Sequence, residues 1–245
     1  MAGLRRLLED FAEAFPCPLQ DVTRARMETW LEAVPRGPGR WNHILGTVCA
    51  LARFARKEGA IGSELVPVEQ MEKRRQTHTV QIYTVDELKA ILAGAEREWL
   101  PVFVLGAFSG LRPEEIAPEA QHKPGLCWEH LLWDKDKVDV PAEVSKVKRR
   151  RFAHLPENAK AWLEPWRKAS GLIGPKQRFC HSPRNFAVTW KPDGLRHSYA
   201  SYRLALTKDV PALALEMGNS PSIIFRHYLE MVHEPEARAW FAVMP

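Results

Sequence analysis

The helical periodicity of this chain is interrupted at two places, and these interruptions constrain its fold more than any other feature. Up to about residue 60, apolar residues recur at helical spacing, most clearly along the run that begins at Trp41. Residues 66–82 then lose this spacing and gather polar and charged side chains. We therefore place a small helical bundle at residues 1–75 and a linker at residues 76–82.

A second domain, residues 83–245, begins where the helical signals return. Thr84 offers an N-cap and Glu87 stands three residues later, so the pair forms a capping box that opens an apolar helix. Between Leu126 and Pro156 the period changes, which predicts short strands joined by tight turns. Helical patterns then resume. We predict a mainly α fold with a small antiparallel β-sheet, of the α+β class.

The composition is that of an ordinary globular protein. Of 245 residues, 45% are hydrophobic and 27% are charged, which excludes a disordered or fibrous chain. A net charge of +5 and a pI near 9.1 mildly favour a polyanionic partner. No run approaches the ~20 apolar residues that span a bilayer. The first apolar run also carries acidic residues, so we expect no signal peptide.

The cysteines and histidines give little support to a metal site. The four cysteines are scattered and form no CxxC pair, so neither a disulfide framework nor a zinc site is indicated, and a reducing cytoplasm is expected. His122, Cys127 and His130 are loosely spaced and lack a fourth ligand. We interpret them as ordinary core side chains and expect neither a metal nor a cofactor.

Three short segments of the second domain and one tyrosine carry the strongest functional signal. They are Gly110-Leu111-Arg112-Pro113-Glu114-Glu115, Gly194-Leu195-Arg196-His197-Ser198, Met217-Gly218-Asn219-Ser220 and the isolated Tyr228. Asn219 follows Arg196 by 23 positions and precedes Tyr228 by 9, and each segment has the pattern of a loop that leads into a helix. Tyr228 alone would more often be a core residue, because it shares a helix stripe with Ile224 and Met231. The joint spacing favours a functional site.

This set of motifs resembles the tyrosine recombinase (phage integrase) family. The resemblance covers nearly the whole chain, and it is specific in the second domain and only topological in the first. It implies that residues 1–75 are a helical, SAM-like core-binding domain and that residues 83–245 are the catalytic domain, the two forming a clamp around duplex DNA. It also implies the activity of a site-specific recombinase or integrase, which cleaves and rejoins DNA strands through a 3′-phosphotyrosyl intermediate on Tyr228.

Reversible strand breakage without a metal requires a nucleophile that holds the phosphate and cations that neutralise it. The resemblance assigns Tyr228 as the nucleophile, Arg112 and Arg196 as the cations, and Glu115 as the acid that steadies Arg112. A phosphotyrosyl bond conserves the energy needed for religation. Two guanidinium groups can bind the phosphate oxygens in a forked geometry that lysine cannot reproduce.

Basic residues supply the remaining expected contacts. The resemblance implies that Lys146 is the general acid that protonates the departing 5′ oxygen. Lys148, two residues later, is the alternative candidate for this role. A run of basic residues would usually be a solvated face, but one that follows a strand can track a phosphate backbone. We expect DNA contacts from two runs, which are Lys73, Arg74 and Arg75, and Lys148, Arg149, Arg150 and Arg151.

The chain departs from the family's pattern at two positions. Asp193 stands three residues before Arg196, where the family commonly has a histidine, and Asn219 stands where it usually has histidine or tryptophan. The amide nitrogen of Asn219 can still donate to the phosphate. An ionised Asp193 would repel the phosphate by about 4 kcal/mol at a distance of ~4 Å, so unless it turns away or is protonated it can act only as a base. The adjacent His197 is a second candidate for moving the proton of Tyr228.

The resemblance also implies partners. We expect double-stranded DNA, a homotetramer on paired sites, and a monomer or weak oligomer without DNA. Accessory DNA-bending proteins are a further class of partner for such enzymes. We expect no membrane partner, and we expect a cytoplasmic protein of a bacterial cell, associated with the nucleoid and encoded by a chromosome, phage or other mobile genetic element.

Two other functions are consistent with the same residues. One is a DNA-binding relic that has kept the fold and lost its catalytic activity. The departures from the family's pattern at Asp193 and Asn219 would then be signs of that loss. The other is an enzyme that nicks and reseals DNA like a type IB topoisomerase, which resembles this family in nucleophile and cations. Salt-sensitive binding without cleavage would indicate the first, and relaxation of supercoiled DNA by a monomer the second.

The segment beyond Tyr228 leaves one question open. Trp240 and Phe241 lie on a short amphipathic tail. This tail can fold back onto its own domain, or it can dock into a neighbouring subunit as the resemblance implies, and the sequence does not favour either.

Overall fold

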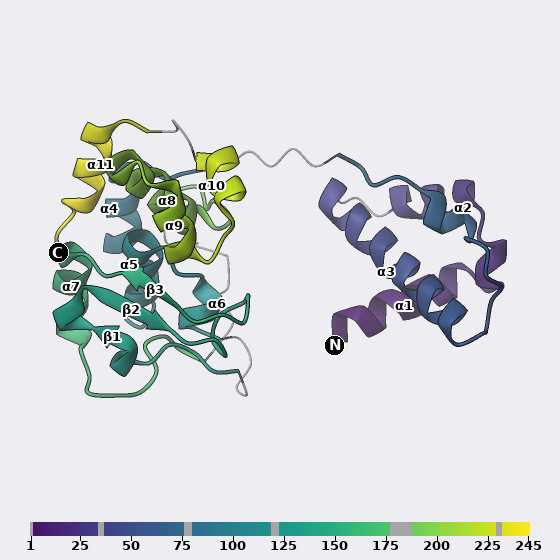
Figure 1. Ribbon diagram of the computed structural model, residues 1–245, viewed down its shortest axis with the longest axis horizontal. Helices are drawn as coiled ribbons and strands as arrows, with labels where there is room; N and C mark the ends of the chain where they lie inside the picture. The colour runs from purple at the N-terminus through teal and green to yellow at the C-terminus, as the bar shows by residue number, and fades with distance from the viewer. Residues whose placement is uncertain (1, 34–36, 76–79, 119–122, 177–187, 229–231) are drawn as a thin grey trace. The chain divides into compact units, whose positions relative to one another are not determined.

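The computed structural model describes residues 2–33, 37–75, 80–118, 123–176, 188–228 and 232–245. The chain divides into two compact units, Met1–His78 and Thr79–Pro245, which run from purple to blue and from blue through green to yellow in Figure 1. Residues 76–79 of the predicted linker, and His122, lie outside the described residues. The assignment of the units as core-binding and catalytic domains stays a prediction.

The first unit is a helical bundle. Its described helices are α1 (Ala2–Ala14), α2 (Arg24–Ala33) and α3 (Pro38–Lys57), with short 3-10 turns at Leu19–Asp21 and Pro67–Gln70. Their apolar faces meet in one core that includes Phe11, Met27, Trp41 and Val48. The ring of Phe11 also packs edge-on against that of Trp30, with centroids 5.7 Å apart. The predicted helical bundle is confirmed.

The second unit is mainly helical. Its described helices are α4 (Val85–Ala93), α5 (Leu100–Ser109), α6 (Pro113–Ile116), α7 (Glu157–Leu163), α8 (Gly194–Thr207), α9 (Val210–Met217), α10 (Pro221–Tyr228) and α11 (Glu234–Phe241). Short 3-10 turns lie at Trp128–His130, Trp133–Lys135 and Glu164–Trp166. The predicted capping box opens α4, because Thr84 and Glu87 exchange two backbone-to-side-chain hydrogen bonds of 2.7 and 3.2 Å.

A three-stranded antiparallel sheet forms the other part of this unit. Its strands are β1 (Leu131–Leu132), β2 (Lys137–Val140) and β3 (Arg151–His154), in the order β1-β2-β3. Val138 pairs with Ala153, and Val140 pairs with Arg151. The predicted class, mainly α with a small antiparallel sheet, is confirmed. The connection between β2 and β3 carries Lys146, so this hairpin positions the predicted general acid.

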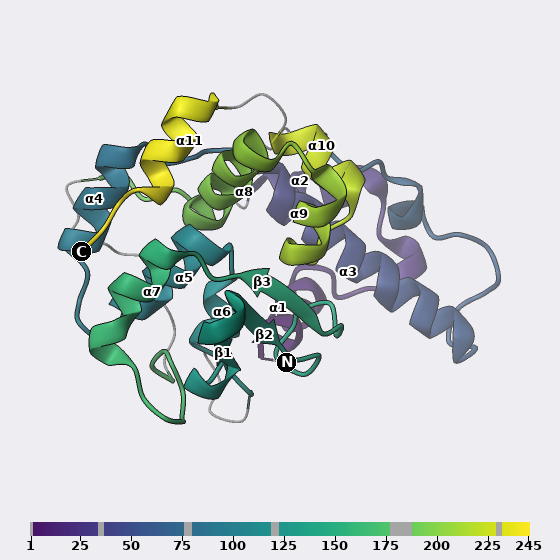
Figure 2. The same ribbon diagram turned by 60° about the vertical axis from the view of Figure 1, so that its left-hand side comes forward.

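Helix α5 is the centre of the second unit. Every residue of Leu100–Ser109 is buried, and Figures 1 and 2 show α4, α8 and α11 on one side of it and the sheet with α7 on the other. The helix ends at Gly110, whose backbone is left-handed with φ 65°. A Cβ at this position would lie 2.3 Å from the ring of Tyr199 in α8. Glycine is therefore required here, and it lets the segment that carries Arg112 lie directly against α8.

Changing Gly110 to Ala should destabilise this unit by roughly 3 kcal/mol, since the new side chain meets both an unfavourable φ and the Tyr199 ring. Urea unfolding followed by circular dichroism measures the change. Gly46→Ala in α3 is the matched control, because nothing lies within 4 Å of a Cβ there and alanine favours a helix interior. Equal stability of the two variants would contradict the packing described for Gly110.

The C-terminal helix α11 packs onto its own unit. Trp240 is buried, its ring stacks on Tyr202 with centroids 4.4 Å apart, and its indole N–H donates to the carbonyl of Ala107 at 3.0 Å. Figure 2 shows α11 alongside α8. Of the two arrangements that the sequence leaves open, this structure of one chain has the tail folded back.

Candidate active site

Arg112 and Glu115 are held together by the short helix α6. Pro113 fixes the first helical position after Arg112. The Glu115 carboxylate then accepts hydrogen bonds from the Arg112 backbone N–H at 3.0 Å and from its guanidinium at 3.4 Å. Glu115 is 1% exposed, so solvent hardly screens its charge. The carboxylate therefore orients Arg112, which is the role that the resemblance implies for it.

Arg196 extends from the first turn of α8 and is 5% exposed. Its guanidinium donates to the backbone carbonyl of Gly110, and to that of Met217 at 2.6 Å. These carbonyls belong to the ends of α5 and α9, so one side chain fastens two helices at the site. Burial, followed by the charge of Arg112, lowers the pKa of Arg196 to about 9. The group stays cationic at neutral pH.

The side chain of Asn219 joins the two arginines. Its Oδ1 atom accepts a hydrogen bond from the guanidinium of Arg112 at 3.2 Å and from that of Arg196 at 3.4 Å. Asn219 directly follows Gly218, which ends α9 with a φ of 63°. The sequence suggested that the amide nitrogen donates to a phosphate, and the structure adds that the oxygen brings both cations to one acceptor. Two converging guanidinium groups can bind an anion that has several oxygen atoms.

Tyr228 ends α10 within the described residues and is 4% exposed. Its hydroxyl lies 2.6 Å from Nδ1 of His197, on the first turn of α8. Burial raises the pKa of Tyr228 above its ordinary value of 10.0. The charges of Arg196 and Arg112 act to lower this pKa, and that of Asp193 acts to raise it. The phenol therefore needs a base to become a nucleophile at neutral pH.

Asp193 and His197, the two candidate bases, differ in their exposure and in their contact with Tyr228. Asp193 is exposed and precedes α8 with a left-handed backbone, φ 51°, and its carbonyl accepts the His197 backbone N–H at 2.9 Å. His197 is half-buried and makes the contact with the Tyr228 hydroxyl. Of the two side chains, His197 is therefore the one placed within hydrogen-bond distance of the phenol.

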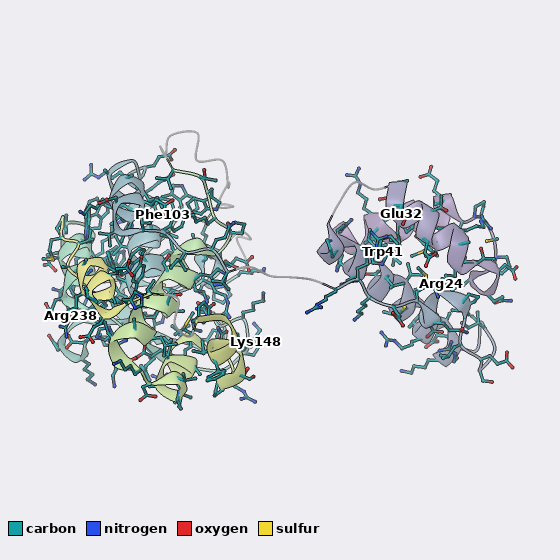
Figure 3. All side chains as sticks on the ribbon, turned by 90° about the horizontal axis from the view of Figure 1, so that it is seen from above. Arg24, Glu32, Trp41, Phe103, Lys148 and Arg238 are labelled. Carbon is teal, nitrogen blue, oxygen red and sulfur yellow. The ribbon has the colours of Figure 1, made fainter. Side chains whose placement is uncertain are left out.

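The loop between β2 and β3 presents several of the predicted basic residues. Lys146 and Arg149 are exposed on it. Lys148 is exposed too, with a left-handed backbone of φ 55° and its ammonium 3.4 Å from the carbonyl of Glu143. Figure 3 shows Lys148 at the surface of the second unit. These three lysine and arginine side chains are placed where a polyanion can reach them.

The other two arginines of this run are engaged within the protein. Arg150 is exposed and forms a two-pronged ion pair with Asp139, at 2.9 and 2.6 Å. Arg151 is 8% exposed and pairs with both carboxylate oxygens of Glu115, at 3.0 and 2.7 Å. The structure therefore does not present Arg151 to DNA, contrary to what the basic run suggested. A buried cation is retained here because it has a buried anionic partner.

Of the three basic residues at 73–75, two are exposed and one is bound within the first unit. Lys73 and Arg75 are exposed. The Arg74 guanidinium lies over the ring of Trp41, 3.4 Å from its centroid, and pairs with Glu32 at 3.0 Å. Trp41 and Glu32 lie close together in the first unit (Figure 3). Arg74 thus fastens this segment to its own unit.

Two side chains near the site make contacts that the sequence does not predict. The basic run predicts that Arg151 contacts DNA with its neighbours, although period-two alternation in β3 places Arg151 and Ala153 on the inner face. Glu216 was not singled out. Its carboxylate accepts from the Tyr199 hydroxyl at 2.7 Å and from Arg203 at 3.3 Å. No local pattern in the sequence predicts this contact between α8 and α9.

Replacing Glu115 by Gln should lower the free energy of unfolding at pH 7 by about 3–5 kcal/mol, because it leaves the buried Arg151 without its anion. Burial acts to raise the pKa of Glu115, but the hydrogen bond and charge of Arg151, together with the Arg112 backbone N–H and the charge of Arg196, leave the pKa below the ordinary value of 4.5. The carboxylate therefore stabilises the fold fully above pH 4.5, and this contribution is lost as the pH falls through the folded-state pKa. Urea unfolding of both proteins should show a difference that shrinks below pH 4.5, and a constant difference would contradict the ion pair.

No group of three or more histidine, cysteine or acidic side chains that could hold a metal occurs in the described part of the chain. His130 caps a turn there, with Nδ1 accepting the backbone N–H of Cys127 at 2.9 Å. Among the described helices, none is long and apolar enough to cross a membrane.

Solved structures of two integrases are similar to this chain. A lambda integrase fragment, solved as a dimer bound to a COC′ core site, matches with a TM-score of 0.69 and 14% identity, over 94% of this chain and 88% of that one. The Tn1549 transposon integrase in complex with circular intermediate DNA matches with a TM-score of 0.62 and 14% identity, over 91% of this chain and 86% of that one.

The Tn1549 transposon integrase in complex with transposon right end DNA matches with a TM-score of 0.65 and 13% identity, over 97% of this chain and 91% of that one. No protein-family model matches the sequence, and the search of curated proteins found no match. At this level of identity the likeness shows the fold. The chain therefore has the tyrosine recombinase fold, as the motifs predicted.

Proposed function

We propose that this chain is a site-specific DNA recombinase, which breaks and rejoins DNA strands through a 3′-phosphotyrosyl link on Tyr228. The observation that carries the proposal is the convergence of Arg112 and Arg196 on one amide oxygen, at 3.2 and 3.4 Å. A phosphodiester offers two non-bridging oxygens, which two forked cations can bind. The cations then stabilise the additional negative charge of the transition state.

The proposed cleavage step uses three side chains besides the two arginines, which are a nucleophile, a base and an acid. The Tyr228 oxygen attacks phosphorus while its proton passes to His197, with Asp193 as the other candidate base. The bond between phosphorus and the 5′ oxygen breaks, and Lys146 protonates that oxygen. One strand then ends in a 3′-phosphotyrosyl link and the other in a 5′-hydroxyl. Attack of a 5′-hydroxyl from a partner strand reverses these steps and rejoins the DNA.

Double-stranded DNA is the partner that we propose. The similar lambda and Tn1549 integrases were solved with DNA. In this chain, Lys146, Lys148 and Arg149 are exposed on the β2–β3 loop, and Lys73 and Arg75 are exposed at the end of the first unit. Each cation that replaces a counterion on the backbone adds to the affinity and makes it depend on salt.

Recombination requires more than one copy of such a site. We propose that four copies bind two DNA sites, exchange strands in pairs through a four-way junction, and separate to monomers or weak oligomers without DNA. The setting that fits this activity is a bacterial cytoplasm, with a mobile genetic element or chromosome as the substrate. Accessory DNA-bending proteins would direct the choice between integration and excision.

A plasmid assay separates the proposed activities. The purified chain is added to a supercoiled plasmid that carries two copies of the DNA flanking its own gene. A recombinase yields exchanged products whose formation rises steeply with protein concentration, because several copies act together. Relaxed plasmid without exchange, at a rate proportional to monomer, would contradict recombination and indicate nicking and resealing.

A DNA-binding protein without cleavage activity is the second candidate, and Asp193 is the observation that favours it. Its charge acts to raise the pKa of Tyr228 and would repel a phosphate. If Asp193 limits an intact site, Asp193→His should raise the cleavage rate by about 10²-fold or more, which is the scale of acid–base catalysis. Single-turnover cleavage of a nicked duplex measures the rate. Unchanged binding with no cleavage in either protein would support the relic.

A further inference from the structure

The guanidinium of Arg151 binds three separate parts of the second unit. Two N–H groups pair side by side with the Glu115 carboxylate, at 3.0 and 2.7 Å. Nε donates to the backbone carbonyl of Glu216 at 3.0 Å, and another N–H donates to the Ser145 hydroxyl at 3.3 Å. Arg151, Glu115 and Ser145 are all buried. This geometry is therefore built into the core rather than formed at the surface.

Each of these contacts lies next to a group of the proposed active site. Glu115 holds Arg112. The carbonyl of Glu216 precedes that of Met217, which accepts from Arg196 at 2.6 Å. Ser145 precedes Lys146 in the chain. Arg151 thus connects the supports of both phosphate-binding arginines to the loop that carries the proposed general acid.

The Arg151 side chain passes close to Gly218, the residue that ends α9. Gly218 has a left-handed backbone, and a Cβ there would lie 3.2 Å from Cδ of Arg151 and 3.7 Å from Cγ2 of Val147. The first distance is tighter than an ordinary van der Waals contact. The β2–β3 loop and the end of α9 therefore lie close together along the Arg151 side chain, and Gly218 accommodates this approach.

Neutralisation of Glu115 alone does not explain this arrangement. Arg112 already contacts the same carboxylate, and a lysine at 151 could supply a compact positive charge. Only the planar guanidinium offers five donors in a fixed fork. Its four hydrogen bonds described above join Glu115, Glu216 and Ser145 at once. The spanning geometry, rather than the charge, distinguishes arginine at this position.

We propose that Arg151 is a positioning residue, which holds the Lys146 loop in register with Arg112 and Arg196. It touches neither DNA nor the reacting atoms, and acts through Ser145 and Glu115. The inference rests on the proposed function, because the register matters only if Lys146 protonates the departing oxygen. Loss of Arg151 should then harm protonation of that oxygen more than it harms DNA binding.

The test compares two nicked duplexes that differ in one atom at the scissile phosphate. One has the natural 5′ oxygen, and the other has sulfur in its place, whose thiolate leaves without needing a proton. Arg151→Lys should cleave the oxygen substrate about 10²-fold more slowly than the unaltered chain, which is the scale of general acid catalysis. On the sulfur substrate the two proteins should differ by less than about 3-fold, and their DNA dissociation constants should agree within about 2-fold.

Two further variants keep this test decisive. Ser145→Ala removes one contact of Arg151 without a charge change, and should show a smaller deficit that is also confined to the oxygen substrate. This variant decides the matter if Arg151→Lys does not fold. Arg203→Lys loosens the neighbouring ion pair with Glu216, and should leave the ratio of oxygen to sulfur rates unchanged.

Equal deficits on both substrates, or a deficit that appears as weaker DNA binding, would overturn the positioning role while leaving the recombinase assignment intact. A Ser145→Ala variant that matches the unaltered chain on both substrates would overturn it as well. Absence of cleavage by the unaltered chain on both substrates would instead overturn the proposed function, and the inference with it. The two failures are therefore distinguishable.

Discussion

Changing Tyr228 to Phe should abolish the covalent DNA adduct, a loss on the order of 10⁴-fold or more in cleavage rate, because the phenolic oxygen is the only atom removed and is the proposed nucleophile. The ring is buried in a cluster that includes Met217 and Ile224, and phenylalanine fills the same space. The lost hydrogen bond to His197 should cost about 1 kcal/mol of stability. The measurement is trapping on a nicked suicide duplex, resolved by denaturing gel electrophoresis.

Tyr202→Phe is the matched control for this variant. Its hydroxyl donates to the carbonyl of Tyr83 at 2.9 Å, so it also loses one buried hydrogen bond, but it should keep forming the adduct. The DNA dissociation constant of Tyr228→Phe should stay within about 2-fold of the unaltered chain, since backbone contacts by cations dominate affinity. Persistent trapping by Tyr228→Phe would contradict the assignment of the nucleophile.

Changing Arg196 to Lys should lower the single-turnover cleavage rate by about 10²–10³-fold, the scale of losing one preorganised donor to the transition state. Lysine keeps a positive charge but lacks the fork that donates to the carbonyls of Gly110 and Met217. Its ammonium would therefore neither fasten the two helix ends nor stay beside Asn219. The unfolding free energy should fall as well, because two buried carbonyls lose their donor.

The control for this change is Arg238→Lys on the outer surface of α11, where the arginine is 72% exposed and pairs with Glu234. Surface ion pairs contribute about 0–1 kcal/mol, so both the cleavage rate and the stability should stay close to those of the unaltered chain. The cleavage rate of Arg196→Lys, measured below its unfolding temperature, decides the point. A rate within a few-fold of the unaltered chain would show that Arg196 serves only to fasten the helices.

The features predicted correctly from the sequence are those with local causes. The capping box of Thr84 and Glu87 depends on a spacing of three residues. The contact between Arg112 and Glu115 spans the same three residues, and the family resemblance rather than the spacing pointed to it. The small sheet followed from a loss of helical period between Leu126 and Pro156. Such signals are contained within a few residues of sequence, and they fix where each helix begins and which side chains share its first turn.

The features that the sequence could not give depend on contacts between distant segments. Arg151 meets Glu115 across 36 positions, and a basic run gives no sign that one of its members is buried. The choice of His197 as the partner of Tyr228 rests on a contact across 31 positions between α8 and α10. Similarly, Arg112 and Arg196 meet the Asn219 side chain across 107 and 23 positions of sequence.

The most direct test of Tyr228 as the nucleophile is to locate the covalent bond. The unaltered chain is incubated with a nicked suicide duplex from the DNA flanking its own gene, the complex is digested with protease, and the peptide that carries the nucleotide is sequenced by mass spectrometry. We expect a phosphotyrosyl link at Tyr228 and a free 5′-hydroxyl. A link at another residue, or DNA binding without a link even after Asp193→His, would contradict this expectation.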